Sequence, residues 1–456
     1  MMNFRRNLAI LAAAVATAKD SVMKTGKNTA QASDRSGPTW DSRRLTLVAV
    51  ATGLSLLLLV LAGPTRAQGV VRAWGMGGAS TAASRGLEAV VYNPANLAFS
   101  DGMTVGLAAG AADIHNNAFS LDRYNEITGQ YLDSADKAQL LSDIPEDGFK
   151  LDADVSASAL GFQTGNFALS FSGLGSGQGN LDKDYFDLVL NGNQLGETID
   201  FSNTWGEGSA VGSAALSYGM VVLNGAGSQV SVGLNARYLQ GIYEMHVTDA
   251  YGTLSTSMTE LSGEAYVATE SSNGGQGYGL DLGIALQTIG GWHFGLAVDN
   301  VLGTINWDQN VERQEMRVTA ADVNLLNGDL DAAVADADTT FKTDGYSTTL
   351  PQRARLGAAK QFGSFMVAAD YVQGLENRGI TSTHPLVNAG MEWQLTSYFQ
   401  PRLGISTGGE RGNSATVGVG IKAGPWRLDA AAISRNGMSV GGSKGIGVAL
   451  GSMLQF

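Results

Sequence analysis

Segments in which apolar residues alternate with small or polar ones recur from about residue 103 to the end of the chain. A period of two indicates strands with one apolar face. We count fourteen such segments. They lie at about 103–111, 153–163, 166–174, 208–222, 229–243, 276–288, 291–302, 348–361, 364–373, 385–395, 399–407, 413–423, 426–434 and 444–456.

The connections between these segments alternate between long and short. Residues 112–152, 175–207, 244–275 and 303–347 form long links, whereas residues 164–165, 289–290, 362–363 and 424–425 form tight ones. Outer-membrane barrels have long external loops and short periplasmic turns. The pattern therefore predicts an all-β fold, a 14-stranded antiparallel transmembrane β-barrel in the bacterial outer membrane, with both ends of the barrel on the periplasmic side.

The last segment predicts a strand that runs to the final residue, and the edge of this strand must be paired. Ile446, Val448 and Leu450 share one parity, with glycine and alanine between them, and Phe456 is the last residue. Pairing this strand with the first one, near 103–111, would close a barrel and remove both edges. Phe456 looks like the terminal aromatic of a barrel-assembly signal, which makes the barrel-assembly machinery an expected partner. A last strand of a soluble sandwich is the alternative.

The N-terminal part of the chain has the features of an export signal. The apolar run 45–62 follows Arg43 and Arg44, and small residues (Thr65, Ala67) precede Gln68. A basic region, an apolar core and small residues predict a signal peptide cleaved before Gln68, although a membrane anchor has a similar length. We therefore divide the chain into a cytoplasmic extension and removed signal peptide (1–67), an N-terminal plug or hatch (68–102) and the barrel (103–456).

The net charge and the cysteine content limit the kinds of partner that are expected. Residues 1–67 hold 9 of the 29 Lys and Arg and 3 of the 42 Asp and Glu, which leaves 20 basic against 39 acidic residues and a net charge of −19. This acidic balance excludes nucleic acid as an expected partner. The chain has no cysteine, and charged residues are only 16% of it, which suits a barrel in contact with outer-membrane lipid.

Charged residues within the predicted strands fall on the parity opposite to the apolar faces. Charges are too costly to face lipid, so this face is expected to line the lumen. The predicted lumen network consists of Arg237, Asp281, Asp299, Arg353, Arg355, Asp370, Glu392, Arg402, Lys422, Arg427 and Asp429. Six basic and five acidic groups suggest paired charges. Aromatic residues gather at the predicted tight turns, where a periplasmic aromatic girdle is expected: Trp292, Phe365, Trp393, Tyr398, Phe399 and Trp426.

Residues 72–98, before the first strand, show no alternation and are rich in small residues. Gly75, Gly77 and Gly78 stand near their start, and Asn93, Pro94 and Ala95 near their end. Small residues allow backbones to approach closely, and Asn-Pro marks a turn. The segment is therefore predicted to fold inside the barrel as a plug.

A Met-Gly-Gly-Ala start at residues 76–79 and an Asn-Pro-Ala close at 93–95 resemble the N-terminal signature of the outer-membrane long-chain fatty-acid transporter (FadL-type) superfamily. The loop at 116–125 is similar to that of an uncharacterised branch, related to the type IX secretion shuttle and to conjugation-associated barrel proteins. The resemblance implies a fourteen-stranded barrel with an N-terminal hatch. The transporters' ligand-binding residues have no recognisable counterparts here, so none is assigned.

Residues suited to catalysis or metal binding are scattered. Residues 441–445 fit the G-x-S-x-G pattern but lie in a predicted loop, away from a strand-to-helix turn. The four histidines lack metal-ligand spacing, and the acidic pairs at 152/154 and 329/331 lack the glycine and glutamate of a calcium loop. We therefore expect neither enzyme activity nor a cofactor or metal.

Short helices are expected in the external loops. Ser134 and Asp182 are suitable N-caps, and a third helix is predicted over 319–337. The apolar side chains of the first two form a predicted loop patch: Leu140, Leu141, Tyr185, Phe186, Leu188 and Val189. These side chains pack either against another loop or around a captured apolar ligand.

Two hypotheses for function follow. In the first, the barrel binds a hydrophobic small molecule or passes it across the outer membrane, and movement of the hatch gates passage. In the second, a barrel that transports nothing anchors a secretion or surface-assembly complex, and its partner is a secretion-system protein.

Overall fold

The computed structural model describes residues 70–324, 334–378 and 381–456. The predicted signal peptide therefore lies outside the described residues. No helix in the described part is long and apolar enough to span a membrane.

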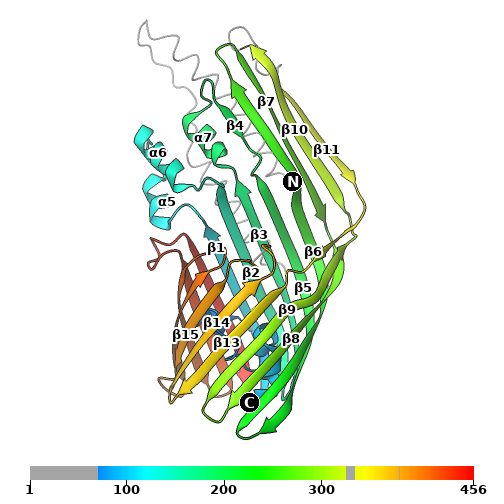
Figure 1. Cartoon of the computed structure of the whole chain (residues 1–456), viewed down its shortest axis with the longest axis vertical. Coiled ribbons are helices and arrows are strands. Elements are labelled where there is room, and N and C mark those ends of the chain that lie inside the picture. Colours follow the sequence, from blue (N-terminus) through cyan, green and yellow to red (C-terminus); the bar gives the residue numbers. More distant parts are fainter. Residues whose placement is uncertain (1–69, 325–333, 379–380) are drawn as a thin grey trace.

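Fourteen antiparallel strands pair in a closed ring (Figure 1). Each overlaps one of the fourteen alternating segments, so the predicted fold class and strand number are confirmed. The ring runs through β1 (Met103–Asn116), β2 (Phe149–Thr164), β3 (Phe167–Leu181), β5 (Trp205–Gly225), β6 (Ser228–Thr256), β8 (Gly275–Thr288), β9 (Trp292–Trp307), β13 (Arg353–Phe362), β14 (Phe365–Gly374), β15 (Leu386–Trp393), β16 (Phe399–Gly408), β17 (Ser414–Ala423), β18 (Trp426–Arg435) and β19 (Gly445–Gln455).

The ring closes where β19 pairs with β1. Ala111 lies opposite Ala449, and the backbone of Phe456 both donates to and accepts from Met103, with N···O distances of 2.9 and 3.1 Å. Closure leaves no unpaired strand edge within the fourteen-stranded ring, where lipid would not tolerate one. The predicted pairing of the last strand with the first is confirmed.

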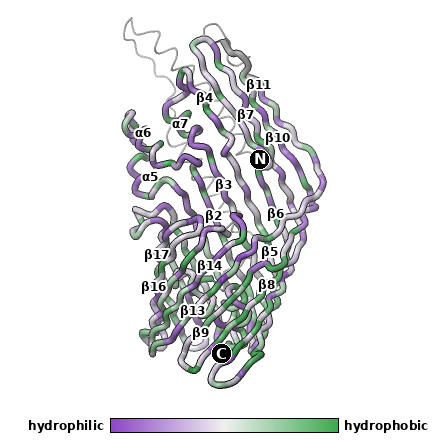
Figure 2. Tube along the Cα trace, in the orientation of Figure 1, coloured by the Kyte–Doolittle hydropathy of each residue, from purple (hydrophilic) through white to green (hydrophobic). Residues whose placement is uncertain are grey.

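The outer surface of the barrel is apolar. On β19, Ile446, Val448 and Leu450 are exposed, whereas Gly447 and Ala449 between them are buried. Hydrophobic residues gather along the lower barrel, while the parts above it are more hydrophilic (Figure 2). Near the tight turns, Trp292 stacks on Phe294 and Phe365 stacks on Trp393, with ring centroids 5.8 and 5.2 Å apart. An apolar belt with an aromatic rim is typical of outer-membrane barrels, and this protein is one.

Three short helices lie beyond the upper rim (Figure 1): α5 (Leu121–Ile127), α6 (Ser134–Asp143) and α7 (Lys183–Asn191). The side chain of Asp133, one residue before the predicted cap, accepts bonds from the first turn of α6. Asp182 caps α7 as predicted. Helices in these two external loops are therefore observed.

A sheet extends above the barrel on the opposite side of the mouth (Figure 1). The upper half of β6 pairs with β4 (Thr198–Asp200) and β7 (Glu260–Ser272), and β10 (Glu312–Asn324) joins β7 to β11 (Val334–Lys342). A further short strand, β12 (Tyr346–Thr349), pairs with β9.

The helix predicted over 319–337 is wrong for its described residues, because 319–324 lie in β10 and 334–337 in β11. Met316, Val318 and Ala320 already alternate with polar residues, and the edge of β7 offers hydrogen bonds to an extended chain. Residues 325–333 of the predicted helix lie outside the described residues.

The N-terminal segment lies inside the barrel. Its elements are α3 (Val71–Gly75), α4 (Leu87–Tyr92) and a 3₁₀ turn η1 (Pro94–Phe99), and we refer to residues 70–99 as the hatch. The hatch touches eight inward-facing glycines on eight different strands, mostly through its backbone, and we call these glycines the glycine row. At each of them an added Cβ would come within 3.0 Å of a hatch atom or of a lumen carboxylate. The glycine row comprises Gly219, Gly233, Gly283, Gly295, Gly357, Gly390, Gly404 and Gly418.

Gly233→Val should displace the hatch while leaving the barrel closed. A Cβ at Gly233 would lie 2.2 Å from the Ala95 nitrogen, whereas valine itself favours a strand. We expect heat-modifiable migration on gels to persist and trypsin to cleave at Arg72 and Arg85, which the seated hatch protects. Gly177→Val on β3, where a Cβ meets nothing within 4 Å, is the matched control. A protected hatch in Gly233→Val would contradict this packing.

Candidate functional site

Buried polar groups fix the hatch to the barrel wall. Asp370 of β14 is almost fully buried, and one of its oxygens accepts from the backbone nitrogens of Ser80 and Thr81 (2.8 Å each) and from the Thr81 hydroxyl (2.7 Å). Three donors converge on one carboxylate oxygen, which is a strong anchor in a site without bulk water.

A chain of ion pairs joins the start of the hatch to the wall near the tight turns. Arg72 of α3 contacts both Glu88 of α4 and Glu392 of β15 at 2.8 Å. Glu392 also pairs with Arg402 (2.6 Å), which reaches Asp429 (2.7 Å), and Asp429 pairs with Arg427. Arg72 therefore couples the two hatch helices to the predicted lumen charges.

The predicted plug residues all lie at contacts with the wall. Gly75 lies against Gly418, and Gly77 has a positive φ and lies against the backbone of Ile405, where no side chain fits. Gly78 also has a positive φ and lies beside the amide of Asn388. The Asn93 side chain accepts from the Ala95 nitrogen and donates to the Ile284 carbonyl of β8.

Pro94 and Ala95 lie directly on the glycine row at Gly219 and Gly233. The glycine row itself is absent from the sequence prediction. The sequence does contain a signal for the glycine row, because eight strands each carry a glycine at an inward-facing position near the middle.

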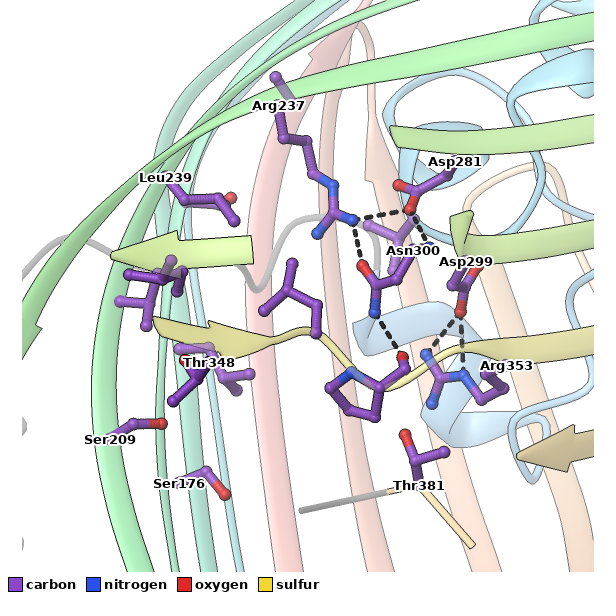
Figure 3. Close-up of a pocket in the computed structure, with 18 of the residues that line it drawn as sticks. Ser176, Ser209, Arg237, Leu239, Asp281, Asp299, Asn300, Thr348, Arg353 and Thr381 are labelled. Carbon is purple, nitrogen blue, oxygen red and sulfur yellow. Dashed lines mark hydrogen bonds and ion pairs between the residues drawn. The ribbon is translucent and has the colours of Figure 1, made fainter. Parts of the chain in front are cut away.

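Above the hatch lies a cavity of about 270 Å³, the upper cavity (Figure 3). Its floor includes Leu87 and Val90 of α4. Its wall includes an apolar cluster of Leu239, Ile305 and Trp307. Trp307 is fully buried, donates to the Thr348 hydroxyl at 2.9 Å, and lies against Gly241, where a Cβ would be 2.3 Å from its ring.

Two groups of predicted lumen charges border the upper cavity. In the first, Arg237 pairs with Asp281 at 2.7 Å and donates to the Asn300 side chain (Figure 3). Asp281 also accepts from Asn235, whose amide reaches the carbonyl of Val90 in the hatch. The Arg237 Nε is buried without a hydrogen-bond partner among the described residues, so one donor of this guanidinium is unsatisfied.

In the second group, Arg353 and Arg355 share Asp299, at 2.7 and 3.0 Å. The Arg355 guanidinium lies 5.0 Å from the ring centroid of Tyr92 in the hatch, a cation–π contact. Burial raises the pKa of the Tyr92 hydroxyl above its usual value, so the ring stays neutral beside Arg355. Both charge groups therefore touch the upper cavity on one side and the hatch on the other.

Below the hatch, near the tight turns, lies a second cavity of about 360 Å³, the lower cavity. It is lined by Arg72, Arg85 and Glu88 of the hatch and by polar residues of the wall. Leu87 lines both cavities. At this residue, the hatch is a thin partition between the two.

Lys422 is the member of the predicted network that stands apart. It has inward parity on β17, opposite Arg427, but it is exposed near the turn, and no ion pair joins it to another described residue. The other ten predicted charges all take part in the bonds described above.

A further charge cluster, missing from the sequence prediction, lies near the upper rim. Asp113 of β1 accepts from Arg435 (2.9 Å) and from Arg411 (3.0 Å), and Arg411 also pairs with Asp154. The prediction ended the first strand at residue 111 and so treated Asp113 as part of a loop. Asp113 and Asp154 are direct cross-strand partners, and two facing carboxylates require cations.

The predicted loop patch is mostly covered. Leu140 and Leu188 are buried, Leu141 is half-buried, and Val189 is exposed. Phe186 contacts Phe149 and Tyr185, with ring centroids 5.4 and 5.7 Å apart. Packing of the loops against one another, one of the two alternatives, accounts for these contacts.

Ser443, in the G-x-S-x-G pattern, is buried, and its hydroxyl bonds to backbone atoms of Arg435 and Gly445. None of the described residues' hydrogen bonds joins it to a histidine. Within the described part of the chain, no group of three or more His, Cys, Asp or Glu residues is placed to hold a metal ion.

The fold and the lumen together define a class: an outer-membrane β-barrel whose interior is occupied by its own N-terminal segment. A family model described as a family of unknown function (DUF5723) matches residues 94–272 and 259–433. The matches cover most of the chain, which belongs to this family. No curated protein matches it.

Solved structures with a similar fold include the toluene transporter TbuX of Ralstonia pickettii (14% identity, TM-score 0.45, 84% of this chain and 97% of that one). A FadL homologue of Pseudomonas aeruginosa is 14% identical, with a TM-score of 0.46 over 87% of this chain and 100% of that one. The toluene transporter TodX of Pseudomonas putida is 12% identical, with a TM-score of 0.43 over 84% and 95%. The FadL-type resemblance and its branch stay predictions from the sequence, and the family that the comparisons show is DUF5723.

Asp370→Ala should loosen the hatch. Removing one partner of a buried charged interaction costs about 3 kcal/mol, which would raise the population of displaced hatch about 100-fold. Planar-bilayer recordings should show more frequent openings than in the wild type. Asp154→Ala, which removes a buried lumen carboxylate that bonds to Arg411 and not to the hatch, is the control. Equal conductance in both variants would show that Asp370 is not the anchor.

Proposed function

We propose that this protein binds a small hydrophobic molecule in the upper cavity and passes it across the outer membrane by displacement of the hatch. The observation that carries the proposal is the upper cavity itself, which combines an apolar wall of Leu239, Ile305 and Trp307 and a floor made by the hatch with hydroxyl, amide and charged groups around them. Mostly apolar cavities with a few placed polar groups are typical of small-molecule sites.

The contacts of the charge groups support a route from binding to hatch movement. Arg237 borders the cavity and is linked through Asp281 and Asn235 to the carbonyl of Val90 in α4. A ligand with one polar atom that bonds to the Arg237 guanidinium would compete with Asp281 and Asn300 within this network. Through this network, a bound ligand would change the free energy of the seated hatch by a different amount from that of the displaced hatch. Such a difference is required for a ligand to shift the equilibrium between the two states.

A second candidate function, an anchor for a secretion or surface-assembly complex, is favoured by the sheet above the barrel. Its edge strand β11 is exposed from Ala335 to Lys342 and pairs only with β10 among the described residues. An exposed edge strand offers backbone groups to a partner strand.

Ser209→Trp should block the upper cavity. Ser209 lies on β5 with its side chain at the cavity wall (Figure 3), and an indole there would occupy space that a ligand needs. We expect binding of toluene or octanoate by the detergent-solubilised protein, measured by calorimetry, to weaken at least tenfold. Uptake of the labelled compound by expressing cells should fall in parallel.

The control is Leu216→Trp, on the same strand but on its exposed outer face. Wild-type binding in Ser209→Trp, or equal loss in both variants, would exclude the upper cavity as the binding site. Purification in mild detergent separates the two candidate functions, because a stoichiometric protein partner without bound small molecule would favour the anchor.

A further inference from the structure

The charges around the lower cavity balance with one exception. Arg72, Arg402 and Arg427 form the ion-pair chain with Glu88, Glu392 and Asp429, three positive against three negative groups. Each of these carboxylates contacts at least one arginine. This chain is therefore neutral as a unit and leaves no carboxylate for a further cation.

Arg85 of the hatch is the exception. Its guanidinium donates to the carbonyls of Ala82 and Ser84 (3.2 and 2.6 Å) and to Nδ1 of His293 (3.0 Å). No carboxylate of the described residues forms an ion pair with it, and Glu88 and Asp101 act on it only at longer range. Burial and the neighbouring Arg72 lower the pKa of Arg85 to about 10, so it remains charged at neutral pH.

The contact with His293 adds a second donor. An arginine can only donate, so Nδ1 of His293 accepts, and the hydrogen of the neutral ring lies on Nε2. His293 also lines the lower cavity. The hydrogen bonds of Arg85 use three of its five N–H groups, which leaves two others for a ligand.

The remaining wall supplies neutral hydrogen-bonding groups. Four glutamines and two hydroxyl residues line the lower cavity: Gln361, Gln394, Gln400, Gln455, Thr104 and Ser364. Amides and hydroxyls around one uncompensated guanidinium suit a polar ligand with an anionic oxygen group, because bonds from a charged donor to such oxygens are strong. A volume of about 360 Å³ accommodates a small molecule.

We propose that the lower cavity is a binding site for a small hydrophilic molecule that carries a carboxylate or phosphate group, held by Arg85 and entering from the periplasmic side. The site goes beyond the proposed function, because its lining is more polar than that of the upper cavity and it does not depend on passage of a hydrophobic molecule. Arg85 belongs to the hatch and is two residues from Leu87, so an occupant contacts the partition from below.

The test is calorimetry on the full-length protein in detergent at constant ionic strength. The probes are inorganic phosphate, acetate and dihexanoyl phosphatidic acid, with dihexanoyl phosphatidylcholine as the zwitterionic reference. We expect saturable binding of at least one anion, weakened at least tenfold by Arg85→Gln. Binding of phosphate or acetate identifies a free anion as the source, and binding of the short lipid alone identifies a lipid headgroup.

Lys422→Gln is the matched control, because it removes an exposed cation near the same turns without touching the cavity lining. It should bind as the wild type does. Resistance of Arg72 to trypsin shows whether the hatch stays seated in Arg85→Gln. If the hatch is displaced in that variant, Arg85→Lys, which keeps the charge, should retain anion binding. The proposal fails if no anion binds the wild type, if a seated Arg85→Gln variant binds equally, or if Lys422→Gln loses as much.

Discussion

The contact between the hatch backbone and the glycine row is the interaction on which the rest of the lumen depends. At Gly404 and Gly390 the wall approaches Gly77 and Met76 so closely that a methyl group would lie about 2 Å from a backbone atom. Such proximity lets a short segment fill a wide barrel without a large core of its own. Dispersion between closely packed atoms then replaces the side-chain layers that fill smaller barrels.

This packing explains why the charges lie where they do. With the hatch seated on glycines, its polar backbone faces the wall, and Asp370, Asn235 and Asn93 supply the bonds that buried N–H and C=O groups need. Arginines and carboxylates then pair across the remaining space. The hatch also divides that space unequally, with an apolar wall above α4 and amides and guanidinium groups below it. One partition thus separates two chemically different chambers, and Leu87 is its common wall.

The barrel could be predicted from the sequence because its constraints are local and repetitive. Alternation of side chains, such as that from Ile446 to Leu450, depends only on strand geometry and on lipid outside. The upper sheet escaped prediction because the pairing that holds it together, β7 with β10, is not local. Residues 319–324 have an apolar content that suits a helix, and pairing with β7 and β11 makes the extended form better. Asp113 was missed for a related reason, since its strand continues past the apolar segment into the region above the lipid.

The sequence by itself determined the closed barrel, its orientation, the inward parity of the lumen charges and a small-residue segment suited to its interior. Each follows from period-two patterning, loop length or residue size. Only the tertiary structure decided which glycines meet the hatch, which carboxylate each arginine binds and that Arg85 forms no ion pair with a carboxylate of the described residues. Those relations join segments far apart in the chain, such as Arg72 of the hatch with Glu392 of β15, and a local sequence pattern contains no information about distances across a barrel.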